Sequence, residues 1–312
     1  MIKKIVIVDT VGALDLVNDK FFENFPFVSE WHGHELKECA DTIPHPHGGF
    51  ACSQALLPLW ETDDEIHVHF VRIFDSKAKS IPMAVARWST DLIANIASES
   101  RSRTWVNCSW GTYIGSNIPS QSARADRWRT LIAARNATVM WAAGNSGDFK
   151  VDVDENLPSG MLTDCSHKIA AAYKNGDTAR FSSDSTHAEP AATFWAVEVK
   201  GMNPVTGQWK STTGTSFASP KATGLAAALD LGYDGFKVLA QSKSTTPAGF
   251  DGPLPHPKWG YGWLEYEYQN LIKDCPYTAP DVALNAVDEA DPTGYFDFDE
   301  MPTEEIQKLV AP

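Results

Sequence analysis

The sequence has few basic residues relative to acidic ones, and this shortage restricts the partners that we expect. Its 26 Lys and Arg stand against 40 Asp and Glu, so the formal net charge is −14 at pH 7. Proteins that bind a nucleic-acid backbone do so mainly through clustered positive charge, which this composition does not favour. The balance of charge therefore predicts no nucleic-acid partner.

Cysteines and long apolar runs are also scarce. The five cysteines are widely spaced and contain no Cys-x-x-Cys pair, so we expect no disulfide framework and a reducing compartment. No stretch approaches the roughly 20 apolar residues of a membrane-spanning helix. The apolar run at residues 5–8 ends at Asp9 and is too short for a secretion signal. These absences predict a cytoplasmic chain without membrane association.

The apolar pattern predicts alternating strands and helices. Residues 4–8 form a continuous β-branched run, which is typical of a parallel strand covered on both faces. Residues 14–46 read as irregular, and a hairpin is expected between Gly201 and Trp209. The other expected strands are 65–74, 104–108, 138–142, 168–172 and 194–199, and the other expected helices begin at His47, cover 82–97 and 125–135, and follow Ser216.

This alternation predicts an α/β fold of three αβα layers with a mostly parallel sheet. We assign residues 1–272 to this domain. The remaining residues, 273–312, form an acidic C-terminal extension, because nine acidic residues and no Lys or Arg occur between Asp281 and Glu305. This extension is either a solvated tail or a segment that docks on the domain or on a protein partner.

The most informative stretch is residues 214–220, Gly-Thr-Ser-Phe-Ala-Ser-Pro. Gly214 lets another backbone approach, and Ser216 lies where a tight turn becomes a helix. A helix start offers unpaired N–H groups and positive potential, so an anion forming near Ser216 would be stabilised. Ser216 is therefore either a nucleophile or an ordinary capping serine, and the choice depends on a base and an acid elsewhere.

Three other segments supply suitable partners. Asp9 ends the first strand, His47 begins a helix followed by small residues, and Asn145 follows the strand at 138–142. Asp9 alone could simply cap a turn. A zinc site is an alternative for the histidine-rich region, through His32, His34, Cys39, His45 and His47, but its spacing is loose. We assign no metal ligands.

Taken together and in this chain order, Asp9, His47, Asn145 and Ser216 resemble the subtilisin-like serine proteases, the subtilases. The resemblance covers roughly residues 4–270. It is strongest at 214–220, where Phe217 replaces a usual Met, and at 142–145, Ala-Ala-Gly-Asn. The helix start at His47 has Gly49 where Thr is usual, and the Gly after Asp9-Thr10 comes one residue late. The segment Gly260–Leu264 is similar to a closing Gly-x-Gly motif.

The resemblance implies a serine endopeptidase acting on polypeptides. It implies a triad of Asp9, His47 and Ser216, and an oxyanion hole made by the Asn145 amide and the Ser216 backbone N–H. It also implies that a substrate strand lies between two segments, with Trp110 in the apolar wall of two subsites. These segments are Ser109, Trp110 and Gly111 on one side and Ala142, Ala143 and Gly144 on the other.

Several further expectations are narrower. The segment around Asn156 is expected to form the floor of the first pocket, where Asp154 or Glu155 would favour a basic residue. Many subtilases bind calcium, so the resemblance leaves a structural calcium ion as an alternative. We assign no cofactor. The chain begins eight residues before Asp9 and so leaves no room for an N-terminal inhibitory segment.

Two other functions are weighed against the peptidase. One is a catalytically silent subtilase-fold scaffold or virion component, which the acidic extension suggests. The other is an esterase of a different fold, which the absence of a Gly-x-Ser-x-Gly turn around Ser216 disfavours.

Overall fold

The computed structural model describes most of the region between residues 2 and 264. The described residues are 2–10, 25, 27–32, 46–59, 62–74, 83–98, 102–111, 118–135, 137–145, 157–173, 179–183, 193–195, 199–202, 209–212, 214–246, 251–256 and 259–264. The C-terminal extension and the predicted boundary at residue 272 lie outside them.

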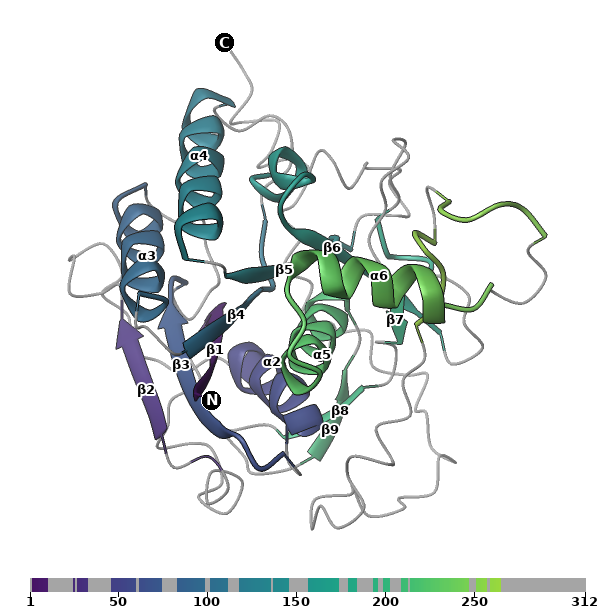
Figure 1. Ribbon diagram of the computed structural model, residues 1–312, viewed down its shortest axis with the longest axis horizontal. Helices are drawn as coiled ribbons and strands as arrows, with labels where there is room; N and C mark the ends of the chain where they lie inside the picture. Colours follow the sequence, from purple (N-terminus) through teal and green to yellow (C-terminus); the bar gives the residue numbers. More distant parts are fainter. Residues whose placement is uncertain are drawn as a thin grey trace.

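A parallel sheet of seven strands forms the middle layer, in the order β2-β3-β1-β4-β5-β6-β7 (Figure 1). Every neighbouring pair in this order is parallel. The strands are β1 (Ile2–Asp9), β2 (Phe27–His32), β3 (Glu65–Arg72), β4 (Ser102–Cys108), β5 (Thr138–Ala142), β6 (His167–Ala172) and β7 (Thr193–Trp195).

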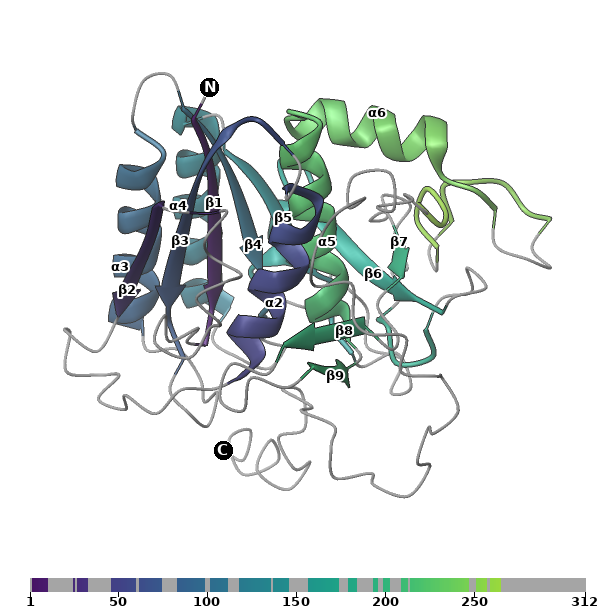
Figure 2. The same ribbon diagram turned by 90° about the horizontal axis from the view of Figure 1, so that it is seen from below.

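Helices cover both faces of this sheet (Figure 2). On one face lie α2 (Pro46–Leu56), α5 (Thr215–Ala228) and α6 (Tyr233–Lys243), and on the other lie α3 (Met83–Ile96) and α4 (Ile118–Arg135). Two 3₁₀ turns, η3 (Leu57–Leu59) and η6 (Ser159–Leu162), and the antiparallel hairpin β8 (Val199–Met202) and β9 (Trp209–Thr212) complete the described elements. The predicted three-layer fold is confirmed.

The central strand shows why the sequence forms this architecture. Side chains alternate across a strand, so Ile5 and Ile7 of β1 join the core under α2 and α5, while Val6 and Val8 join the core under α3 and α4. All four are fully buried. A continuous apolar run is therefore what a strand between two helical layers requires.

Three expected elements differ from the structure. β2 lies within the region read as irregular, because an edge strand with half-exposed residues does not show a clear apolar alternation. α4 begins at Ile118 rather than residue 125, with Pro119 in its first turn, where a missing N–H costs little. The run 194–199 is not one strand, since β7 pairs with β6 whereas β8 pairs with β9.

Within the described part of the chain, no helix is both long and apolar enough to cross a membrane.

Candidate active site

The strand order brings the ends of β1, β4 and β5 together at one edge of the sheet. From β1, the chain builds β2 and β3 on one side and then crosses to β4, β5 and β6 on the other. Ligand sites in open α/β sheets lie at such a switch point, beyond the carboxyl ends of the strands. Asp9 is the last residue of β1, Ser109 follows β4, and Asn145 lies just beyond β5.

Asp9 and His47 form a buried hydrogen-bonded pair. His47 Nδ1 lies 2.7 Å from Asp9 Oδ1, and the two residues are 4% and 2% exposed. Asp9 Oδ1 also accepts the backbone N–H of Thr10 at 2.6 Å. A carboxylate only accepts, so Nδ1 carries the proton and the lone pair of the imidazole is on Nε2. This is the tautomer that a general base needs.

Thr10 connects the end of β1 to the start of α2. Its hydroxyl accepts the backbone N–H of Gly48 at 3.0 Å, which satisfies one of the unpaired donors in the first turn of α2. Its N–H holds the Asp9 carboxylate. Thr10 therefore sets the relative position of Asp9 and His47, and sequence reasoning did not assign it this part.

Helices α2 and α5 cross closely at Gly224. A Cβ at Gly224 would lie 2.1 Å from the carbonyl oxygen of Ala55, so only glycine permits this approach. Near their N-terminal ends the two helices are also in contact. The rings of His47 and Phe217 lie 5.2 Å apart between centroids, and Phe217 directly follows Ser216. The base and the candidate nucleophile thus come from two helices in contact.

Ser216 lies at the second position of α5 and is 7% exposed. Gly214, the residue before the helix, has φ of 144°, a value that L side chains rarely adopt. Its carbonyl accepts the N–H of Phe217 at 3.1 Å and closes the turn around Ser216. The turn therefore presents Ser216 at the positive end of a buried helix.

Asn145 is held in one orientation by the start of α5. Its Oδ1 accepts the N–H of Thr215 at 2.9 Å and the Thr215 hydroxyl at 3.0 Å. The backbone N–H of Gly144 donates to the same hydroxyl at 3.1 Å. Because the amide oxygen is engaged, Nδ2 is the end that faces away from Thr215 and can donate. Thr215 therefore holds the Asn145 side chain in place, a role that the sequence analysis did not assign to it.

A buried chain of hydrogen bonds connects the carbonyl of Ser216 to the end of β4. Ser219 Oγ donates to Asn107 Oδ1 at 2.8 Å, and Asn107 Nδ2 donates to Ser109 Oγ at 2.9 Å. Ser109 Oγ in turn donates to the carbonyl of Ser216 at 2.8 Å. This network fixes α5 against the end of β4. The sequence analysis assigned no role to Asn107 or Ser219. Asn107 is a polar residue inside the otherwise apolar end of β4, and this pattern could have indicated a buried hydrogen-bonding role.

The predicted substrate segments follow neighbouring strands. Residues 109–111 leave β4 and residues 143–144 leave β5, next to the last register pair, Cys108 and Trp141. Trp110 packs against Trp141 and Phe74, with centroid distances of 5.1 and 6.4 Å. Asp154, Glu155 and Asn156, predicted to form the first pocket, lie outside the described residues.

Buried titratable groups surround the site. Burial, with a smaller contribution from the Asp9 charge, raises the pKa of the Cys108 thiol well above its usual range. Burial alone raises the pKa of Cys52 and lowers that of Lys221 to about 7. The described residues contain no cluster of three His, Cys, Asp or Glu suited to a metal. His34, Cys39 and His45 lie outside this part of the chain.

The three-layer fold thus carries a buried Asp9–His47 pair, and Ser216 at the start of a helix that packs against the helix of His47. Residues 67–244, more than half of the chain, match the subtilase family. The chain belongs to this family and is a serine peptidase. The matched region contains Asn145 and Ser216 but begins after Asp9 and His47. The contact between Asp9 and His47 is therefore an observation that does not depend on the family match.

Solved structures show the same fold. A cold adapted subtilisin-like serine proteinase is 16% identical, with a TM-score of 0.62 over 84% of this chain and 88% of that chain. The prenylagaramide maturation protease PagA is 16% identical, with a TM-score of 0.61 and coverage of 84% and 90%. The patellamide maturation protease PatA is 20% identical, with a TM-score of 0.59 and coverage of 84% and 93%. No curated protein sequence matches the chain.

Proposed function

We propose that this peptidase cleaves peptide bonds through a triad of Asp9, His47 and Ser216. The observation that carries the proposal is the buried 2.7 Å contact between Asp9 Oδ1 and His47 Nδ1. It fixes the imidazole with its lone pair on Nε2, on a helix that packs directly against the helix of Ser216. An ordinary capping serine would have no need for such a base.

In this mechanism, His47 Nε2 accepts the proton of the Ser216 hydroxyl as Oγ attacks the carbonyl carbon of the substrate. The buried Asp9 carboxylate stabilises the imidazolium that forms. His47 then gives the proton to the leaving amine, and an acyl-enzyme remains. Water enters and is deprotonated by the same imidazole, and Ser216 is released.

The negative charge on the tetrahedral intermediate needs preorganised donors. The amide of Asn145 suits this role because its oxygen accepts from Thr215 at 2.9 and 3.0 Å, which fixes the orientation of its nitrogen, the donor end of the side chain. The backbone N–H of Ser216, in the first turn of α5, supplies a second donor. Donors of this kind typically contribute about 10²–10³-fold to kcat.

Labelling with a fluorophosphonate probe tests the proposal directly, since such probes react with an activated serine. We expect wild type to be labelled, and Ser216→Ala not to be. His47→Ala should be labelled at least 10³-fold more slowly, because the base is lost. Ser242→Ala, which removes an exposed hydroxyl on α6, is the matched control and should be labelled like wild type.

The position of the label is then read by mass spectrometry of a digest. Circular dichroism establishes that each variant is folded. A folded wild type that is not labelled, or equal labelling of wild type and Ser216→Ala, would overturn the assignment and favour a catalytically silent scaffold.

A further inference from the structure

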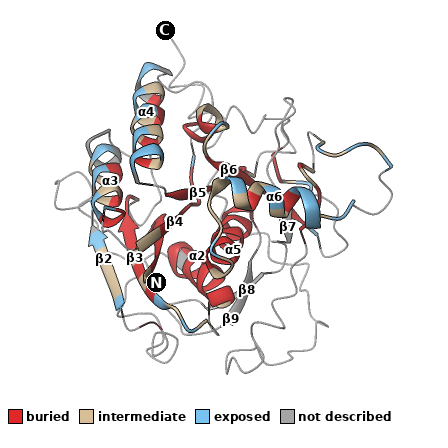
Figure 3. Ribbon diagram, in the orientation of Figure 1, coloured by how far each residue is buried: buried red, intermediate tan, exposed pale blue. Residues whose placement is uncertain are grey.

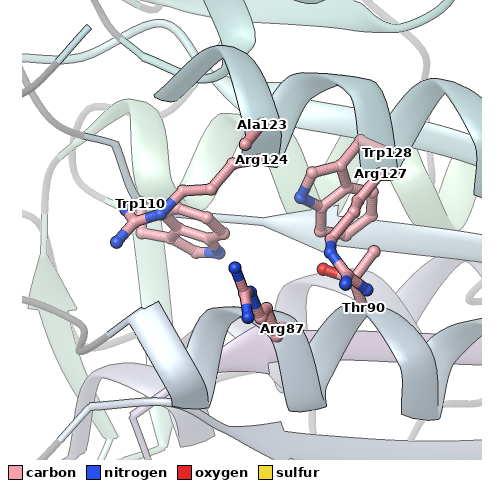
Figure 4. Close-up of a pocket in the computed structure, with 7 residues that line it drawn as sticks. All are labelled: Arg87, Thr90, Trp110, Ala123, Arg124, Arg127 and Trp128. Carbon is pink, nitrogen blue, oxygen red and sulfur yellow. The ribbon is translucent and has the colours of Figure 1, made fainter. Parts of the chain in front are cut away.

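A cavity opens between α3 and α4 (Figure 4). These two helices cover the other face of the sheet from α5, the helix of Ser216 (Figure 2). Its volume is about 30 Å³. That space accepts roughly two water molecules or one carboxylate group. The residues that line it are Arg87, Thr90, Trp110, Ala123, Arg124, Arg127 and Trp128.

Three of the seven lining residues are arginines, in a chain whose net charge is −14. Figure 4 shows Arg87 from α3 and Arg127 from α4 in the space between the helices, and Arg124 extending from α4 along Trp110. One nearby acid balances part of this charge, because Arg127 Nη1 lies 2.7 Å from Asp91 Oδ1. Among the described residues, no acid forms an ion pair with Arg87. The cavity therefore has a local excess of positive charge.

The surroundings of the cavity strengthen its attraction for an anion. Burial lowers the pKa of the Arg124 guanidinium, so this cation has lost part of its hydration. The buried indoles of Trp110 and Trp128 form apolar walls of the cavity, and electrostatic interactions are stronger beside such walls than in open water. The guanidinium fork matches the geometry of a carboxylate.

The cavity is connected to the candidate active site through Trp110. The residue before it, Ser109, donates a hydrogen bond to the carbonyl of Ser216 at 2.8 Å. Trp110 itself is a wall of the cavity. A polypeptide lying along residues 109–111 would therefore pass both Ser216 and the cavity. The sequence predicted only an apolar wall at Trp110, because the arginines come from two helices that are distant in sequence.

We propose that this cavity is a specificity site that binds the carboxylate of an acidic side chain in the polypeptide substrate. The proposal rests on the proposed function, since it places the scissile bond at Ser216. Arg124 and Arg87 would donate to the carboxylate, and Trp110 would pack against the methylene groups of the same side chain. Charge-assisted hydrogen bonds of this kind give roughly 10- to 100-fold discrimination between Glu and Gln.

Binding to Ser216→Ala, the full chain without its nucleophile, tests the inference without requiring cleavage. The probes are pairs of eight-residue peptides that differ by one Glu or Gln, with that residue placed in turn at each position. Trp110 and Trp128 report binding through their fluorescence. At one or two positions, we expect the Glu peptide to bind about 10- to 100-fold more tightly than its Gln partner.

Additional substitutions in the Ser216→Ala background locate the effect. Arg124→Gln and Arg87→Gln should each reduce the Glu preference by about tenfold or more. Lys243→Gln, which removes the same charge from the exposed end of α6, should leave it unchanged. Equal binding of Glu and Gln peptides at all positions, or an equal loss in Lys243→Gln, would overturn the proposal.

Inorganic phosphate distinguishes a substrate subsite from a site for free anions. We expect millimolar phosphate to compete with the Glu peptide and not with the Gln peptide. Tight phosphate binding without any Glu preference would also overturn the proposal. Failure of the triad is read separately, because probe labelling at Ser216 does not depend on these arginines.

Discussion

The two helical layers of this protein have opposite characters. Figure 3 shows α2 and α5 buried almost throughout, whereas α3 and α4 each expose one side. The buried layer is built from small residues, and it carries His47 and Ser216 on helices that touch. The outer layer carries the arginines of the α3–α4 cavity. Under the two proposals above, one layer holds the reactive groups and the other contributes to substrate selection.

Substituting the glycine at the helix crossing is the strongest way to break the buried layer. In Gly224→Ala, the new Cβ would lie 2.1 Å from the carbonyl oxygen of Ala55, so α2 and α5 must separate. We expect a loss of about 3 kcal/mol or more in the free energy of unfolding. Because His47 and Ser216 move apart, probe labelling should also slow. Denaturant unfolding and labelling rates measure both effects.

Gly235→Ala is the matched control for this substitution. It lies in α6, where the added methyl would meet only the flexible side chain of Leu231, at 3.2 Å. A helical alanine is favoured over glycine by about 0.5–1 kcal/mol, so this variant should be as stable as wild type or slightly more stable. Equal stability of Gly224→Ala and Gly235→Ala would contradict the close crossing.

The contact between the sheet and α6 should also be sensitive to acid, through His167 of β6. Its ring stacks on Tyr233 of α6, and burial lowers the pKa of His167 from 6.5 to about 4. Between these values the unfolded chain binds a proton that the folded chain does not. The stability present above pH 6.5 is therefore lost as pH falls towards 4, by about 3 kcal/mol. Urea unfolding at several pH values measures this slope.

Two histidine variants assign the slope. His167→Gln keeps a donor for the Tyr233 carbonyl, which His167 Nε2 contacts at 3.0 Å, and should flatten the dependence between pH 7 and pH 4. His67→Gln, which changes a partly exposed histidine beside Glu65, should retain the wild-type slope. An unchanged slope in His167→Gln would show that other groups cause the acid sensitivity.

A smaller effect is expected from substituting Asn107, which connects the end of β4 to α5. Asn107→Ala leaves the hydroxyls of Ser109 and Ser219 without their partner and should destabilise the protein by about 1–3 kcal/mol. As a positioning residue, Asn107 should affect kcat about tenfold and KM little, because the turn at Ser216 shifts. Steady-state cleavage of a peptide measures the two constants.

Asn95→Ala removes an exposed side chain of the same type from α3 and should change neither constant. A stability loss in Asn107→Ala with kcat unchanged would mean that the hydrogen-bond chain supports the fold alone and does not position Ser216.

Much of the fold could be predicted because its strands are buried on both faces. Successive side chains of β1 enter two different apolar cores, so the strand is a continuous apolar run. Such a run can be recognised from the sequence of the segment alone. The start of α4 was harder to predict, because its first turns are polar and show no apolar period. β2 was missed since edge strands are half-exposed. The hairpin of β8 and β9 was predicted from its turn residues, whereas the break between β7 and β8 was not, because the run 194–199 is apolar throughout its first part.

The candidate site divides in the same way. Asp9, His47, Asn145 and Ser216 were predicted because each lies at the end of a strand or the start of a helix. The structure places Asp9 beside His47 and Asn145 beside the start of α5. Their supporting residues, such as Thr10 and Thr215, were not predicted. A threonine near a turn has many roles, and only the position of its hydroxyl relative to another segment reveals which one applies.

The sequence by itself determined the residue types at the strand ends, the order of the motifs and the layered fold, because these depend on local pattern. The tertiary structure alone decided the close crossing at Gly224, the hydrogen-bond chain through Asn107 and the gathering of Arg87 and Arg124 around Trp110. Each of these joins segments that are distant along the chain. Their contacts follow from how helices and strands pack in three dimensions.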